Sequence, residues 1–288
     1  MTLTAVSYCT RTNSPRSWSW ARASGLLVDE WLLERRPPAD LAEHLVCTWR
    51  GDAGEARTLL PDECVDMYWV NGSVWVSAPE TRSWPAAARP GTDAVGVCFR
   101  SGVAPSLLGV AASELRDVRV CLDQLWRGGA ARELAERVSC RDDDDGRAIE
   151  LENAVRQMAA GAWGLDAVAA EVTGRLHLAG TASARELARA TYLSERQLHR
   201  RCTAAFGYGP GFLLRMLRVQ RFLQLARDES RPPSLAGLAI DAGYADQSHL
   251  TREVRTIMGT TPAQLLRSSP ERPIGSRLDP LVGGTLLV

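Results

Sequence analysis

The feature that most constrains the fold is a repeated helical pattern in the C-terminal third of the chain. The stretch RATYLSERQLHRRCTAAFGYGPGFLL (residues 189–214) recurs in degenerate form as DAGYADQSHLTREVRTIMGTTPAQLL (residues 241–266). Leu187-Ala188 matches Leu238-Ala239 at an offset of 51, and one extra residue then enters at the turn. The residues that follow at an offset of 52 are Leu198, Cys202, Ala205, Phe206, Gly207, Pro210, Leu213 and Leu214, matched by Leu250, Val254, Ile257, Met258, Gly259, Pro262, Leu265 and Leu266. The chain therefore builds one helical unit twice.

In each copy the first four matched residues are spaced i, i+4, i+7, i+8, which is the buried stripe of an amphipathic helix. The opposite faces carry residues that are basic or that donate or exchange hydrogen bonds. These are Arg196, His199, Arg200 and Thr203 in the first copy, and Ser248, Thr251, Arg252 and Arg255 in the second. Both copies therefore predict a helix with one buried and one polar face.

Signals for helix starts punctuate the same region. Ser183 precedes Glu186 and Ser194 precedes Gln197 by three residues, the spacing of a capping box, and Asp246 and Ser234 are further N-cap candidates. Two prolines, Pro210 and Pro262, stand at first helical positions. The predicted helices span residues 183–190, 194–206, 210–228, 234–242, 246–258 and 262–267. A short helix that meets a turn at Gly243 and is followed by another helix is typical of a helix-turn-helix, whose second helix can enter the major groove.

Charge is distributed unevenly along the chain. All 34 basic residues are arginine, and they balance 34 carboxylates. Residues 1–179 carry 19 arginines and 25 carboxylates, a net charge of −6, whereas residues 180–288 carry 15 and 9, a net charge of +6. A basic C-terminal part favours a polyanionic partner. An ordinary helical bundle, or a helical module that binds something other than DNA, is the alternative.

Residues 180–267 resemble the DNA-binding domain of the AraC/XylS family of transcription regulators, and AGYADQSHLTREVRTIMGTTPAQLLR is the most specific part of the match. The resemblance implies two helix-turn-helix motifs joined by a long helix, here 210–228. It departs from the family at Tyr192, which occupies a turn position usually held by Gly, and at Phe222, where Ala is more common.

The resemblance also implies which residues face DNA, and Arg can pair with guanine and Gln with adenine. In the first motif these residues are Ser194, Arg196, Gln197, His199 and Arg200. In the second they are Gln247, Ser248, Thr251, Arg252 and Arg255. Two recognition helices in one chain would address successive segments of the major groove.

The N-terminal half alternates short β-like runs with turns between about residues 41 and 102: HLVCTWR, CVDMYWV, SVWVSA and AVGVCFR. The sequence NGS between two of them predicts a hairpin. From residue 103 the pattern becomes helical, including ASELRDVRVCLDQLW, and RDDDDGR (141–147) is expected to be a solvated loop between helices. The predicted fold is α+β, with a β-rich sensor or dimerisation domain (1–179), an all-α DNA-binding domain (180–267) and a loose tail (268–288).

The stretches TLLPDECVDMYWVNG and GVCFRSGVAPSLLGVAASELRDVRVCLDQLW resemble an uncharacterised N-terminal domain that is often joined to AraC-type DNA-binding domains. The resemblance implies a regulatory role and no particular ligand. Glu63 stands where relatives often have Gly.

The residues of this half also allow other functions. Asp62, Cys64 and Asp66 with His44 could form a nucleophilic site, and Cys64 or Cys98 could be a thiol sensor or a methyl acceptor. Cys64 and Cys98 are expected instead to be packing residues, and no enzyme activity is expected. The tryptophans Trp49, Trp69 and Trp75 could either pack in the core or line an effector pocket.

No metal site and no cofactor are expected, because no Cys/His cluster has zinc spacing. The expected partners are double-stranded promoter DNA, RNA polymerase if the protein activates transcription, a small-molecule effector and a second copy of the chain. No signal peptide or membrane-spanning run is expected, so the expected location is the cytoplasm, with the nucleoid.

Overall fold

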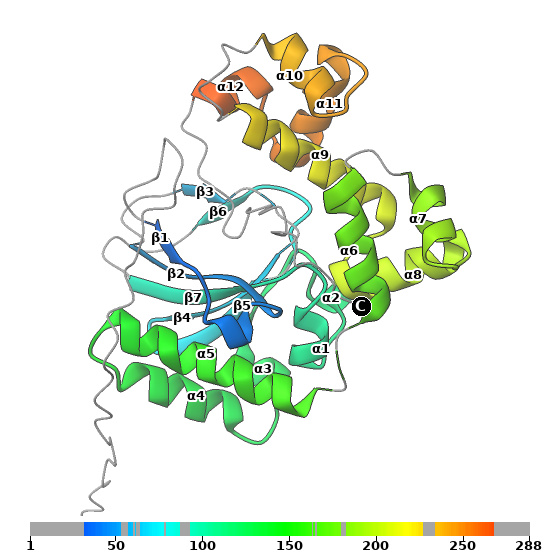
Figure 1. Cartoon of the computed structure of the whole chain (residues 1–288). Helices are drawn as coiled ribbons and strands as arrows, with labels where there is room; N and C mark the ends of the chain where they lie inside the picture. The colour runs from blue at the N-terminus through cyan, green and yellow to red at the C-terminus, as the bar shows by residue number, and fades with distance from the viewer. Residues whose placement is uncertain are drawn as a thin grey trace, which may run out of the picture.

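The structure is a computed structural model, and it describes residues 32–52, 57–59, 61, 64–77, 79–86, 93–162, 164, 166–179, 183–226 and 234–267. A β-rich domain comes first and is followed by helices, as the sequence predicts (Figure 1). The expected tail, 268–288, lies outside the described residues. No helix in the described part of the chain is both long and apolar enough to span a membrane.

Six strands form one antiparallel sheet in the order β1-β2-β7-β4-β5-β8, and two more, β3 and β6, pair separately. The strands are β1 (Leu32–Arg35), β2 (Leu45–Asp52), β3 (Arg57–Leu59), β4 (Val65–Val70), β5 (Ser73–Ser77), β6 (Trp84–Ala86), β7 (Asp93–Phe99) and β8 (Arg119–Cys121). The four predicted runs correspond to β2, β4, β5 and β7. The predicted hairpin joins β4 to β5 through Asn71 and Gly72, both of which have positive φ as a tight hairpin turn requires.

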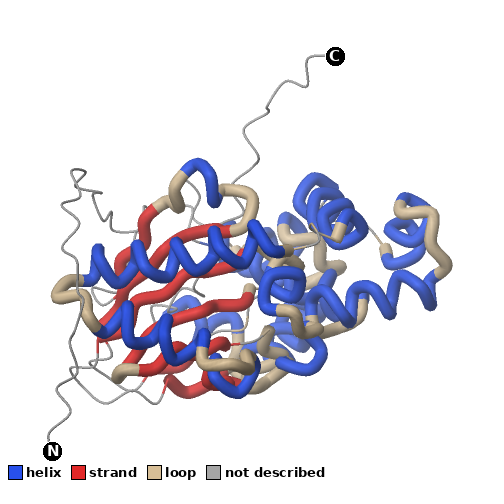
Figure 2. The backbone as a smooth tube through the Cα atoms, turned by 90° about the horizontal axis from the view of Figure 1, so that it is seen from below, coloured by secondary structure: helices blue, strands red, loops and turns tan. Residues whose placement is uncertain are grey.

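One face of this sheet is covered by α4 (Ala130–Ser139) and α5 (Asp144–Gly161), which cross the strands in Figure 2. Alternate residues of the central strands, such as Met67, Val76 and Val97, are fully buried beneath them. Glu152 of α5 is 2.9 Å from the guanidinium of Arg35 on β1 and accepts a hydrogen bond from the hydroxyl of Thr48 on β2. The buried charge is thereby paired and hydrogen-bonded, the condition under which a protein tolerates it.

Two predictions for the segment between the strands and the long helices are wrong. ASELRDVRVCLDQLW is not one helix but α2 (Ala112–Leu115), strand β8 and α3 (Leu122–Leu125), with α1 (Ala104–Leu108) before it. Asp117 takes a positive φ of 58° and its carboxylate accepts hydrogen bonds from the amide and hydroxyl of Thr81, which turns the chain toward β5. RDDDDGR is not only a loop, because Asp143 caps α5 at Gly146 and the next two carboxylates lie in its first turn, where the helix dipole favours them.

The C-terminal helices match their predicted ranges to within one or two residues. They are α7 (Ala184–Ala190), α8 (Glu195–Phe206), α9 (Pro210–Ala226), α10 (Leu235–Asp241), α11 (Gln247–Met258) and α12 (Pro262–Arg267), and α6 (Ala167–Ala179) precedes them. The last two predicted residues of the linker helix lie outside the described residues. The helices form two clusters, one built on α6 to α8 and one on α10 to α12, and α9 contributes to both. The repeat is thus two small cores that share one helix.

Candidate nucleic-acid interface

The two recognition helices, α8 and α11, are equivalent structures of 12 residues each, and their first residues lie 52 positions apart. Ser194 caps α8 by accepting from the amide of Gln197, and Asp246 caps α11 by accepting from the amide of His249. Both helices end at a glycine with positive φ. The buried stripe of each is the predicted one: Leu198, Cys202, Ala205 and Phe206 in α8, and Leu250, Val254, Ile257 and Met258 in α11.

The turns that precede these helices share one backbone geometry. The amide of Leu193 donates to the carbonyl of Ala188, and the amide of Tyr244 donates to that of Ala239, so the pattern is reproduced at an offset of 51. Tyr192 and Gly243 both have positive φ, 55° and 86° respectively. Tyr192 therefore preserves the turn, although a residue with a Cβ carries strain there.

The faces opposite the buried stripes are open. Arg196, His199, Arg200, Gln247, Ser248, Arg252 and Arg255 are exposed, and Thr251 is partly exposed. The side chains of Ser194 and Gln197 are also exposed, but they are occupied with each other: the Gln197 side-chain oxygen accepts from the amide and the hydroxyl of Ser194. Capping is therefore the role that the structure shows for this pair. The imidazole of His199 packs against Gly209, where an added Cβ would lie 2.5 Å from Nε2.

The linker helix holds the second motif through a charged cluster that the sequence does not reveal. Glu253 of α11 is buried, and its carboxylate lies 3.1 Å from the Arg215 guanidinium of α9 and 3.3 Å from the imidazole of His249. Arg218, one turn further along α9, lies over the ring of Tyr244. These contacts fix α11 relative to α9 and leave Arg252 and Arg255 facing outward.

The end of α8 is docked on the N-terminal domain. Arg116 donates to the carbonyl of Gly207, and a Cβ on that glycine would lie 3.2 Å from the carbonyl oxygen of Ala112. A Cβ at Gly102 would lie 2.8 Å from the ring of Phe206. A second contact joins α9 to the N-terminal domain, because the buried side-chain amide of Gln220 donates to the carbonyl of Pro61 at 2.9 Å. Nothing local in the sequence marks Gly102, Arg116 or Gln220 for these contacts, so the sequence does not predict them.

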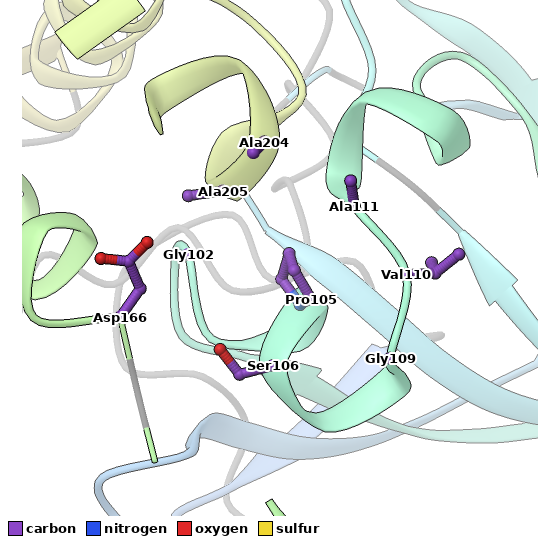
Figure 3. Close-up of a pocket in the computed structure, with 9 residues that line it drawn as sticks. All are labelled: Gly102, Pro105, Ser106, Gly109, Val110, Ala111, Asp166, Ala204 and Ala205. Carbon is purple, nitrogen blue, oxygen red and sulfur yellow. The ribbon is translucent and has the colours of Figure 1, made fainter. Parts of the chain in front are cut away.

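A small pocket lies beside this contact, between α1 and α8 (Figure 3). Its walls are mostly small side chains, among them Pro105, Ala204 and Ala205, and Ser106 and Asp166 are its polar groups. The Asp166 carboxylate is already engaged, since it accepts from the amides of Val168 and Ala169 and lies 3.3 Å from Arg201. It therefore ties α6 to α8.

The three tryptophans considered as pocket walls do not share one face of the sheet. Trp49 and Trp75 lie in the row of residues that runs through Gly96 and Tyr68, whereas Trp69 pairs with Val74 on the other face. There its indole N–H donates to Ser139 of α4. Trp49 and Tyr68 approach across Gly96, where a Cβ would lie 2.5 Å from the indole. The interpretation in which all three line a single pocket is therefore wrong.

The candidate cysteines, Cys64 and Cys98, are buried. Cys47, Cys64 and Cys98 form a buried cluster with Trp49. Hydrogen bonds with the Cys47 and Cys64 thiols, together with burial, raise the pKa of Cys98, so its thiol stays protonated. Asp62 lies outside the described residues. Among the residues that the structure does describe, no group of three or more His, Cys, Asp or Glu side chains could hold a metal ion.

Two family models match separate parts of the chain. Residues 187–268 match a family described as a helix-turn-helix domain, and residues 33–121 match a domain of unknown function, DUF6597. No curated protein sequence matches the chain.

Among solved structures, an apo variant of ToxT from Vibrio cholerae is 12% identical, covers 77% of this chain and 96% of its own, and has a TM-score of 0.45. Wild-type ToxT from the same species, bound to an unsaturated fatty acid, is 11% identical with a TM-score of 0.43, and the match covers 83% of this chain and 95% of that one.

Three observations agree: the duplicated helical unit, its two capped recognition helices, and the family match of residues 187–268. The chain carries an AraC-type helix-turn-helix domain at residues 187–268 and, ahead of it, a DUF6597 domain at residues 33–121.

Proposed function

We propose that this regulator binds promoter DNA through both recognition helices, with α8 and α11 entering successive segments of the major groove. The observation that carries the proposal is the repeat itself: two capped helices of equal length whose outward faces hold Arg196 and Arg200 in one copy and Arg252 and Arg255 in the other. An ordinary helical bundle needs neither the equal caps nor the arginines on equivalent faces. Arginines at base edges give specificity, and those at phosphates give affinity that depends on salt.

We infer that the N-terminal domain regulates this binding, either by sensing a small molecule or by dimerising. Two contacts support a regulatory coupling, since Arg116 holds the end of α8 and Pro61 holds α9 through Gln220. A conformational change in the N-terminal domain would therefore affect the position of a recognition helix and of the linker helix. The chain acts by binding rather than by catalysis, in the compartment that holds promoter DNA, and RNA polymerase is its further partner if it activates transcription.

The test is DNA binding by the full chain at two salt concentrations, using the DNA around its own gene and a random duplex. A regulator should bind both, with a steep loss of affinity as salt rises, and should prefer one segment of the promoter DNA. Arg252→Ala should cost about 1–3 kcal/mol at that segment if the side chain contacts a base edge, and should lower affinity evenly on all sequences if it contacts phosphate. A folded chain without salt-sensitive DNA affinity would favour the non-DNA interaction module.

Arg189, on α7, gives a matched control because it is exposed in the same motif but lies outside the recognition helices. Arg189→Ala should weaken DNA binding less than Arg200→Ala does. An Arg252→Ala variant that binds both DNAs like the parent would show that α11 does not face the duplex. The first motif alone would then carry recognition.

A further inference from the structure

A groove of about 500 Å³ lies between α2 of the N-terminal domain and the outward face of α8. We call it the interdomain groove. It is lined by Ser113 from α2 and by Arg196, His199, Arg200, Thr203 and Ala204 from α8. One wall is the helix face assigned to DNA. The other wall comes from a different domain, about 80 residues earlier in the chain.

The polar groups of the groove suit an anion. They are two guanidinium groups, an imidazole and the hydroxyl of Ser113, and none of the described lining residues is acidic. The hydroxyl of Thr203 already donates to the carbonyl of His199. The nearest carboxylates along the chain, Glu114 and Glu195, are exposed but do not line it. Arg196 and Arg200 have no ion-pair partner within the part of the chain that the structure describes. Their charge is therefore available to a ligand.

The Ser113 wall is held firmly in place. Its neighbours Ala112 and Leu115 are buried in the N-terminal domain, at 0% and 3% exposure, while Ser113 itself is exposed. Ala112 abuts Gly207 at the end of α8, and Arg116 donates to the carbonyl of Gly207 at 3.4 Å. Figure 3 shows the start of α2 at Ala111 across from Ala204 on α8. The serine hydroxyl is thus presented beside the recognition helix by packing on both sides.

We propose that the interdomain groove receives a phosphate of the DNA backbone, so that the N-terminal domain contributes Ser113 directly to the DNA interface. The hydroxyl donates to a phosphate oxygen while the guanidinium groups of α8 supply the charge. Contacts of this kind fix the register of a protein on the duplex without reading its sequence. The inference rests on the proposed function, and it deepens it by making the domain contact part of the binding surface.

The experiment measures binding of the full chain to a mixed-sequence DNA duplex that spans two helical turns, by fluorescence anisotropy over a series of salt concentrations. Ser113→Arg should tighten binding several-fold and make the slope of log K against log salt steeper by about one unit. Ser113→Glu should weaken binding by a similar factor, because a carboxylate would face the phosphate. Ser113→Ala should weaken it by less than Ser113→Glu does.

Gln124 provides the matched control, since it is exposed on α3, which packs on β5, β8 and α4. Gln124→Arg and Gln124→Glu make the same changes in net charge and should shift affinity much less. Equal effects at the two positions would overturn the proposal, because only overall charge would then matter. Tighter binding by Ser113→Glu than by the parent would also overturn it, because α2 would then obstruct α8.

Two further measurements separate this proposal from the proposed function. Circular dichroism of each variant checks that the fold is retained, which the exposure of Ser113 leads us to expect. If Arg252→Ala weakens DNA binding while the Ser113 variants match their Gln124 controls, the groove proposal fails and the regulator remains. If the parent chain binds no duplex DNA, both fail together.

Discussion

At the scale of single residues, the two helix-turn-helix units differ at the turn before the recognition helix. Tyr192 has a φ of 55° and a side chain that is 96% exposed, so its ring gains almost nothing from packing. Gly243 takes the equivalent position without strain. Left-handed geometry costs a residue with a Cβ roughly 1–2 kcal/mol, and glycine loses part of that advantage through its greater freedom in the unfolded chain.

We therefore expect Tyr192→Gly to raise the free energy of unfolding by about 0.5–1 kcal/mol. Tyr192→Ala keeps the Cβ and should leave stability nearly unchanged. Gly243→Ala, the converse substitution in the second copy, should lower the free energy of unfolding by about 1 kcal/mol. Urea denaturation of the three variants provides the measurement, and a Tyr192→Gly variant less stable than the parent would contradict the strain argument.

A second residue of interest is Asp66 on β4. Its carboxyl group is 7% exposed and accepts a hydrogen bond from the indole of Trp49 at 3.0 Å. Burial raises its pKa to about 7, and the negative charges of Glu80 and Glu34 act in the same direction, while the Trp49 bond and Arg119 oppose them. The folded protein therefore holds a proton that the unfolded chain, with an ordinary pKa near 3.8, has already lost.

This shift predicts a pH dependence of stability. Between pH 3.8 and about 7 the folded state binds more protons than the unfolded state, so the contribution of Asp66 to stability falls as pH rises through that range. Asp66→Asn keeps an acceptor for Trp49 and should flatten this part of the profile, with the largest gain at neutral pH. Thermal melting of both proteins across the range is the measurement, and parallel profiles would contradict the assignment.

At the scale of elements, α9 is the part that makes two motifs into one DNA-binding unit. It contributes Leu213 to the core of the first motif, and Met216, Val219 and Leu223 to the core of the second. Arg215 adds an ion pair with the carboxylate of Glu253 on α11, and the Glu253 side chain is only 5% exposed. The orientation of the second recognition helix therefore depends on a charge that α9 supplies.

Arg215→Ala should lower the free energy of unfolding by about 1–2 kcal/mol, because the buried Glu253 carboxylate is then left with His249 alone. The partial exposure of Arg215 keeps the expected cost below that of a fully buried pair. Combining it with Glu253→Gln should cost less than the sum of the single changes. A double-mutant cycle in denaturant measures this coupling, and strictly additive effects would show that the two side chains do not interact.

At the scale of the whole molecule, the two domains are joined by hydrogen bonds that end on main-chain carbonyls. Gln220 of the linker helix reaches Pro61, and Arg116 of the N-terminal domain reaches Gly207. One bond runs in each direction, so each domain supplies a donor to the other. Pro61 lies in the LPDEC motif that characterises the first domain in the sequence. Pro61 of that motif is thereby placed against the linker between the two DNA-binding motifs.

Gln220→Ala should leave the buried carbonyl of Pro61 without this donor and loosen the contact between the domains, at a cost of about 1–3 kcal/mol. Hydrogen exchange should become faster in α9 and at the start of β4. The matched control is Gln124→Ala, on the surface of α3, which should change neither. Unchanged protection in the Gln220→Ala variant would show that this bond does not couple the domains.

The sequence by itself determined the C-terminal helices, because the signals that define them are local. Each N-cap and its partner are three residues apart, and each buried stripe repeats over a single helix, so Ser194, Asp246 and their helices could be located without a structure. The same reasoning located β2, β4, β5 and β7, whose runs of apolar and aromatic residues are bounded by turns. It failed at residues 112–126, because strand β8, which pairs with β5, interrupts what the sequence pattern predicts to be a helix.

Only the tertiary structure decided how these elements meet. The interactions that join these elements link residues far apart in the chain: Thr48 with Glu152, Gln220 with Pro61, and Ser113 with the face of α8. Strand alternation separated Trp69 from Trp49 and Trp75, which depends on the register of the sheet rather than on composition. Gly96 looks ordinary in the sequence, and its necessity comes from the side chains of Trp49 and Tyr68 that pack against it. Local propensity defines helices and strands, whereas their partners are chosen by packing over long separations.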